Sequence, residues 1–104
     1  MKGARVLVVD DEPTVADGLR MLLESEGYGV RLASTVAGAL GEAAERDVHL
    51  AIVDLVLPDG DGLGLLRELR ERDGALEVIV ITAHGSITKA VDAIKAGAFY
   101  FVEK

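Results

Sequence analysis

The chain has no cysteine, which excludes disulfide bonds, thiolate metal sites and a cysteine nucleophile. This fits a cytoplasmic protein, and we expect that location. Aromatic residues make up only 4% of the 104 residues, so the core must be built mainly from Val, Leu, Ile and Ala. No apolar run approaches the roughly 20 residues of a membrane span, so no contact with a membrane is expected. Residues 1–5 lead directly into a strand pattern, which leaves no room for a signal peptide.

Positive charge is also scarce, since 11 Lys and Arg face 18 Asp and Glu, for a formal net charge of -7. A domain this acidic repels nucleic acid and anionic membrane surfaces, so we expect it to bind neither by itself. The length fits one domain and leaves little room for two. Half of the residues are hydrophobic, which is enough to build a core.

Short apolar runs alternate with helical patterns along the chain. Pro13 suits the first turn of the first helix and Gly27 its end, while Ser86 can cap the fourth helix, which ends at Gly97. Strand–helix alternation of this kind predicts an α/β fold, a parallel sheet with helices on both faces. The predicted strands are residues 6–9, 30–33 (weaker, an edge candidate), 50–53, 78–81 and 99–102. Residues 55–62 are predicted to form a loop before the third helix.

Chemically active side chains follow the predicted strands at their carboxyl ends. They are Asp10, Asp11 and Glu12 after the first strand, Asp54 after the third, Thr82 at the end of the fourth and Lys104 after the fifth. In a parallel sheet these ends meet at one edge, where ligands bind. Converging carboxylates repel one another unless a cation lies among them, and oxygen ligands suit Mg2+. A carboxylate beside a divalent ion, a lysine and a hydroxyl has what phosphoryl transfer to it needs.

Each of these residues has a simpler interpretation when taken alone. Asp10 or Asp11 could cap the first helix, and Asp54 could be a turn residue. Thr82 could be an ordinary strand threonine, and Lys104 a solvated terminal lysine. Their joint placement at strand ends is what favours a shared site.

Four segments, in order along the chain, resemble the receiver domain of two-component response regulators. They are residues 8–12 (VVDDE), 52–62 (IVDLVLPDGDG), 81–85 (ITAHG) and 93–98 (AIKAGA), the last followed by an aromatic strand and Lys104. The resemblance spans nearly the whole chain. It implies a flavodoxin-like, doubly wound parallel sheet of five strands in the order 2-1-3-4-5. Residues 1–104 would then be one receiver domain, truncated before the family's fifth helix.

The resemblance also implies a phosphorylation site and a metal site. Asp54 would accept a phosphoryl group from the phosphohistidine of a sensor histidine kinase or phosphotransfer protein. Asp11 would bind Mg2+ directly and Asp10 mainly through water, together with Asp54 and the backbone carbonyl of Val56. The implied function is a signalling switch that assists its own phosphorylation and dephosphorylation, not a metabolic enzyme.

Further roles follow from the same resemblance. Thr82 would hydrogen-bond the phosphoryl group and Lys104 would pair with it from the other side. Phe101 matches the aromatic residue that changes rotamer as Thr82 moves, although a plain core aromatic is the alternative. Val56 and His84 occupy positions where the family tunes dephosphorylation. Val56 is unsuited to positioning water, and for His84 a loop histidine without a role is the alternative.

Residues 82–86 and 93–101 look most like regulators of the nitrogen-regulator class, which implies transcription regulation as the output and leaves room for a homodimer. Without a fifth helix, apolar surface beside the first and fifth strands should be exposed. Reduced stability, self-association or a covering partner is therefore predicted.

Two other functions use the same residue types. Asp59, Asp61, Gly62 and Glu68 match part of a calcium-binding EF-hand loop, but its first position would be Leu57, which offers no side-chain ligand. A haloacid-dehalogenase-type phosphatase also uses an aspartate nucleophile, magnesium and a lysine. In such an enzyme a second acid lies two residues after the nucleophile. Here that position after Asp10 is Glu12, and the match is poor because Pro13 comes next. A nucleotide-binding enzyme is disfavoured because no phosphate-binding G-x-x-x-x-G-K-[ST] loop is present.

Overall fold

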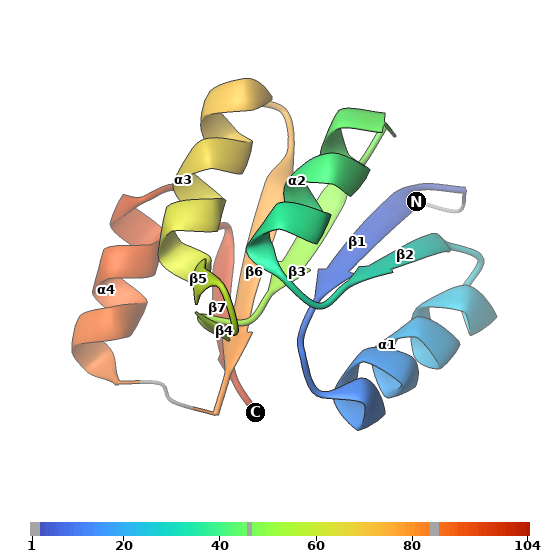
Figure 1. Ribbon diagram of the computed structural model, residues 1–104, viewed down its shortest axis with the longest axis horizontal. Coiled ribbons are helices and arrows are strands. Elements are labelled where there is room, and N and C mark those ends of the chain that lie inside the picture. Colours follow the sequence, from blue (N-terminus) through green and yellow to red (C-terminus); the bar gives the residue numbers. More distant parts are fainter. Residues whose placement is uncertain (1–2, 46, 84–85) are drawn as a thin grey trace.

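The computed structural model describes residues 3–45, 47–83 and 86–104. Five strands form one parallel sheet in the order β2-β1-β3-β6-β7 (Figure 1). They are β1 (Arg5–Val9), β2 (Gly29–Ala33), β3 (Leu50–Val53), β6 (Glu77–Thr82) and β7 (Tyr100–Glu103). Because β6 and β7 are the fourth and fifth strands of this sheet along the chain, the predicted order 2-1-3-4-5 is confirmed. The weaker strand β2 lies at an edge, as predicted.

Helices cover both faces of the sheet. The helix α1 (Pro13–Ser25) lies on one face, and α2 (Val36–Glu45), α3 (Gly62–Arg72) and α4 (Ile87–Lys95) lie on the other (Figure 1). Alternate strand residues divide between the two faces, so Leu7 packs toward α2 and α3 while Val8 packs toward α1. Among the described residues, no helix is long and apolar enough to span a membrane.

The predicted helix ends are confirmed. Pro13 is the first residue of α1, and the side chain of Ser86 accepts a hydrogen bond from an amide in the first turn of α4 at 3.1 Å. The structure adds a cap at α3, where the side chain of Asp61 accepts from the amide of Gly64 at 2.7 Å. Gly27 and Gly97 follow α1 and α4 with φ of 95° and 111°. This left-handed conformation favours glycine, which explains where the two helices stop.

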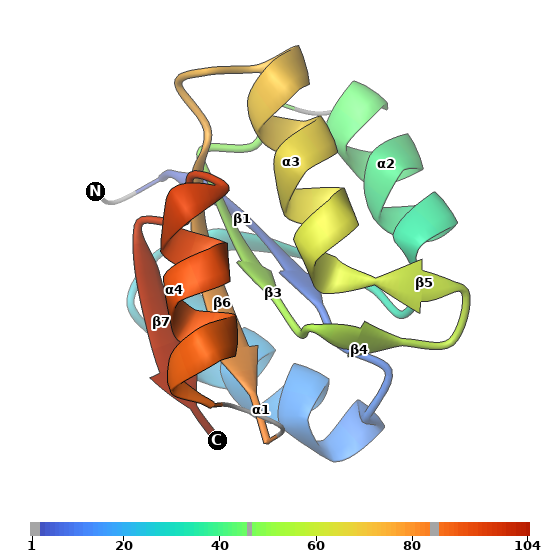
Figure 2. The ribbon, with the colours of Figure 1, turned by 90° about the vertical axis from the view of Figure 1, so that its left-hand side faces the viewer.

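The stretch predicted as a loop instead contains a small antiparallel hairpin of β4 (Val56–Leu57) and β5 (Gly60–Asp61). Leu57 pairs with Gly60, so Pro58 and Asp59 form a two-residue turn. Strands of two residues are too short to show a periodic pattern, so they could not be predicted from the sequence. The hairpin connects the end of β3 to the start of α3 (Figure 2).

Exposed apolar side chains occur at the far edge of the sheet, on β7. Tyr100 is 61% and Val102 36% exposed, and they pair with Ile79 and Ile81 on the face that α1 covers elsewhere. Beside the first strand, Val6 and Val8 of β1 are themselves buried under α1, but Leu32 of β2, which pairs with Val8, is 37% exposed. Reduced stability and self-association stay predictions.

Candidate functional site

Two buried carboxylates stand side by side, just beyond the ends of neighbouring strands. Val9 of β1 pairs with Val53 of β3, so Asp10 and Asp54 are level with each other. The amide of Asp54 donates to the Val9 carbonyl at 2.9 Å, which extends the sheet by one bond. Asp10 and Asp54 are each only 3% exposed. The register of the sheet is therefore sufficient to bring both predicted acids to one edge.

Lys104 reaches the same edge from the end of β7. Its Nζ lies 2.9 Å from Oδ2 of Asp10, 2.9 Å from Oδ2 of Asp54 and 3.0 Å from Oε1 of Glu12. Its amide donates to the carbonyl of Thr82 at 2.9 Å, which fixes the backbone beside β6. Burial acts to lower the pKa of Lys104, but the three carboxylates together outweigh it and raise that pKa above its ordinary value. Lys104 is therefore charged and serves as the counter-ion of the acidic cluster.

The cluster has the oxygen donors that a metal cation needs. Asp10, Glu12 and Asp54 each offer a carboxylate oxygen, and these oxygens lie within 4.8 Å of one another. Oδ2 of Asp10 is buried and pairs with Lys104 by charge, yet has no hydrogen-bond partner in the described part of the chain. The three carboxylates outnumber the single ammonium group. A donor set made only of oxygens, with negative charge in excess, fits Mg2+.

Glu12 belongs to this cluster, whereas Asp11 is exposed and lies outside the group of three carboxylates. The amide of Glu12 donates to Oδ1 of Asp10 at 2.9 Å, which forms a tight turn directly before α1. The sequence showed Glu12 only as part of the acidic run. Its position directly before Pro13, at the start of α1, was the available signal.

The acceptor candidate has both of its oxygens engaged. Oδ1 of Asp54 accepts from the amide of Val56 at 3.2 Å, and Oδ2 accepts from Lys104 at 2.9 Å. The first bond ties Asp54 to the base of the β4–β5 hairpin. The side chain of Asp54 is therefore held in one orientation, and the positively charged ammonium group of Lys104 lies next to one of its oxygens.

Thr82 lies beside Lys104 at the edge of the sheet that holds the carboxylates, and Phe101 lies on the same face of the sheet as Thr82. Val80 pairs with both Val53 and Phe101, so Thr82 extends beyond the level of Asp54 at the same edge. Thr82 is fully buried. Phe101 is half-buried and packs against the core on the side of α3 and α4, away from the carboxylates. His84, the other residue considered, lies outside the described residues.

Comparison with known proteins bears on this arrangement of acids, lysine and threonine. The model of the response regulator receiver domain family matches residues 6–104. The chain belongs to this family. The resemblance noted from the sequence is thereby confirmed.

The similar proteins have response-regulator names. The nitrogen assimilation regulatory protein NtrX of Azorhizobium caulinodans is 42% identical over 101 residues, which cover 95% of this chain and 22% of that protein. A response regulator of Burkholderia pseudomallei, solved with a phosphorylated aspartic acid, calcium and citrate, is 35% identical, with a TM-score of 0.93 and coverage of 97% and 59%. The beryllofluoride-activated NtrC4 receiver domain dimer is 43% identical, with a TM-score of 0.91 and coverage of 96% and 83%. The chain thus spans about a fifth of the length of NtrX and about half of the length of the acid tolerance regulatory protein ActR of Rhizobium meliloti, which is 35% identical over 99 residues.

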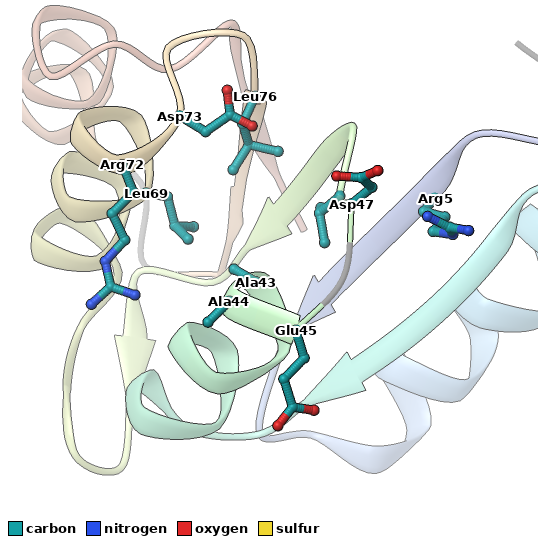
Figure 3. Close-up of a pocket in the computed structure, with 10 residues that line it drawn as sticks. Arg5, Ala43, Ala44, Glu45, Asp47, Leu69, Arg72, Asp73 and Leu76 are labelled. Carbon is teal, nitrogen blue, oxygen red and sulfur yellow. The ribbon is translucent and has the colours of Figure 1, made fainter.

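A prominent hollow of this receiver domain lies away from the acidic cluster. A cavity of about 640 Å³ lies at the opposite edge of the sheet, near the ends of α2 and α3 (Figure 3). Its lining includes Arg5, Glu45, Leu69, Arg72 and Asp73. A smaller hollow of about 260 Å³ adjoins Asp10 and Asp11. A search guided by cavity size alone would therefore have selected a region away from the acidic cluster.

The residues of the EF-hand interpretation do not converge. Asp59 accepts hydrogen bonds from the first two amides of α2, and Asp61 caps α3. Glu68 pairs with Arg72 at 2.7 Å on the surface of α3. Each carboxylate is engaged at a different place, so the structure gives no support to a calcium loop here.

The cap made by Asp59 should make stability depend on pH. Hydrogen bonds from the amides of Val36 and Ala37 lower the pKa of Asp59 from its ordinary value of 3.8. Because the folded state favours the ionised form, this stabilisation is present above the unfolded pKa and is lost as pH falls through the lower folded value. We expect urea unfolding to show wild type more stable than Asp59→Asn near neutral pH, with the gap closing below about pH 3.8. A gap that is the same at both pH values would contradict this.

Proposed function

We propose that this receiver domain is a Mg2+-dependent phosphoryl acceptor, with Asp54 as the residue that is phosphorylated. The observation that carries the proposal is the environment of Asp54. Its carboxylate is buried, it contacts Lys104, and it lies beside Asp10 and Glu12. A buried carboxylate held next to a lysine and an oxygen-lined cation site is suited to receive a phosphoryl group.

The phosphodonor would be the phosphohistidine of a sensor histidine kinase or of a phosphotransfer protein. One oxygen of Asp54 attacks the phosphorus atom, the phosphorus–nitrogen bond breaks, and the imidazole leaves with that electron pair. Lys104 pairs with an oxygen of the transferred group, and the hydroxyl of Thr82 donates to another. The acyl phosphate formed in this step is later hydrolysed, so the domain acts as a switch.

The cation would be held by Asp10, Asp11 and Asp54 together with the backbone carbonyl of Val56. When bound, Mg2+ supplies positive charge that offsets both the carboxylates and the phosphoryl oxygens. The described structure adds Glu12 as the third carboxylate close to Asp10 and Asp54.

The output belongs to the same proposal. Thr82 and Phe101 share one face of the sheet, which supports a switch in which Phe101 responds to Thr82. Residues 1–104 would act as one receiver domain in the cytoplasm, within a regulator of transcription of the nitrogen-regulator class. The net charge of -7 argues against direct contact of this domain with DNA. The NtrC4 receiver domain forms a dimer, and a homodimer is proposed here as well.

Phosphorylation by a small phosphodonor tests the proposal. With Mg2+ and acetyl phosphate, we expect intact mass spectrometry to show the gain of one phosphoryl group. Asp54→Asn should abolish this gain, and so should chelation of Mg2+. Asp73→Asn is the matched control, because Asp73 is also a backbone-capping aspartate but lies at the far end of α3.

The labelling results of the two variants decide whether Asp54 is the acceptor. Label that is lost in Asp54→Asn and retained in Asp73→Asn supports the acceptor role. Label that persists in Asp54→Asn, or no label on the folded wild type, would overturn it.

A further inference from the structure

The start of α2 is capped by two residues from different parts of the chain. Thr35, which directly precedes the helix, accepts a hydrogen bond from the amide of Gly38 through Oγ1 at 2.9 Å. The first two amides, those of Val36 and Ala37, instead donate to Oδ1 and Oδ2 of Asp59 at 2.7 and 3.1 Å. Asp59 lies in the turn of the β4–β5 hairpin. One carboxylate therefore connects the hairpin to α2.

This contact closes a ring of hydrogen bonds that passes through both buried acids. The amide of Asp10 donates to the carbonyl of Ala33, just before α2, at 3.0 Å. At the other side, the amide of Val56 donates to Asp54, and the amide of Asp54 donates to β1. The path runs from Asp10, just after β1, to the start of α2, and from there through Asp59 to the hairpin. It continues from Val56 to Asp54, which is bonded to β1 again.

The hairpin needs such support because it is very short. Each of its strands has two residues, and isolated hairpins are marginal even when longer. Leu57 is buried and anchors one side, while the side chain of Val56 is 48% exposed. The tip lies close to α2, since a Cβ added at Gly60 would come within 3.3 Å of Cγ2 of Val36. The two hydrogen bonds that Asp59 accepts are the polar contacts by which the turn of the hairpin is joined to α2.

We propose that Asp59 is a positioning residue of the cation site: by joining the hairpin to α2, it fixes where the backbone carbonyl of Val56 faces Asp10 and Asp54. This rests on the proposed function, in which that carbonyl is a metal ligand. Asp59 itself does not reach the cation, because its two oxygens are engaged by the amides of α2. Its effect is to hold a ligand in place before the metal arrives, which reduces the ordering that binding requires.

Magnesium affinity, measured by calorimetric titration on folded proteins, tests this inference. Asp59→Ala should weaken Mg2+ binding by about tenfold, the lower end of the loss caused by removing groups that orient metal ligands. Asp59→Asn, which retains one acceptor oxygen, should fall between Asp59→Ala and wild type, and it carries the comparison if the alanine variant does not fold. Thr35→Ala is the matched control, because it removes a cap from the same helix without touching the hairpin.

Hydrogen exchange provides a second measurement that needs no metal. The amide of Val56 should exchange faster in Asp59→Ala than in Thr35→Ala, because only the former frees the hairpin. If both variants lose stability alike and bind Mg2+ like wild type, Asp59 is only a helix cap and the inference is wrong. If wild type binds no Mg2+, the proposed function fails first, and this inference fails with it.

Discussion

Replacing Gly62 with alanine is expected to lower the free energy of unfolding by about 3 kcal/mol, the upper part of the usual range for overpacked sites. A Cβ at Gly62 would lie 2.1 Å from the carbonyl oxygen of Asp54 and 2.8 Å from Cα of Leu55. Both atoms are backbone, so no flexible side chain can move aside. The amide of Gly62 also donates to the carbonyl of Leu55 at 2.8 Å, which fixes the start of α3 against this segment.

The same substitution should disturb phosphorylation. Relief of the overlap requires α3 to move away or the backbone at Asp54 to shift, and that would change the contacts of Asp54 with Lys104 and Val56. We therefore expect Gly62→Ala to label more slowly with acetyl phosphate under conditions in which it is still folded. Urea unfolding followed by circular dichroism measures the stability, and intact mass measures the labelling.

Gly64 offers a matched control two residues along the same helix. A Cβ there would lie 3.8 Å from Oδ1 of Asp61, an ordinary contact. Alanine has a higher helix propensity than glycine, so Gly64→Ala should change the free energy of unfolding by less than about 1 kcal/mol. Equal losses in the two variants would show that the close approach at Gly62 is not the cause.

Replacing Lys104 with methionine is expected to cost about 3 kcal/mol of stability in the absence of divalent cations, the lower end for breaking a buried ion pair. Methionine retains much of the apolar chain but removes the charge. The side chain of Lys104 is 13% exposed, and those of Asp10 and Asp54 are 1% and 5% exposed. The two carboxylates would remain buried without their counter-ion, while the more exposed Glu12 would be less affected.

Added Mg2+ should restore most of the stability that Lys104→Met loses. The carboxylates left unpaired bind a cation better once the competing ammonium group is gone. Thermal unfolding with and without Mg2+ measures this, and the shift in Tm should be larger for the variant than for wild type. Lys95→Met is the control, because Lys95 is exposed at the end of α4. A Mg2+ shift no larger in Lys104→Met than in Lys95→Met would contradict the assignment of Lys104 as the counter-ion.

The sequence by itself determined the architecture and most of the site. Uninterrupted runs such as residues 6–9 and 50–53 indicate buried parallel strands, because both of their faces must be covered. Parallel strands end at one edge, so the order of residues along the chain was enough to place Asp10, Asp54 and Lys104 together. The cap made by Ser86 was also predictable, since a helix cap depends on residues only a few positions apart.

Only the tertiary structure decided which acids meet and what holds them in place. Glu12 joins the cluster while Asp11 is exposed, because the turn after Asp10 sets the directions of the next two side chains. The contact of Asp59 with α2 and the close approach of Gly62 to Asp54 join segments that no periodic pattern relates. Local patterns record which face of an element is buried, whereas these contacts depend on how the elements pack against one another.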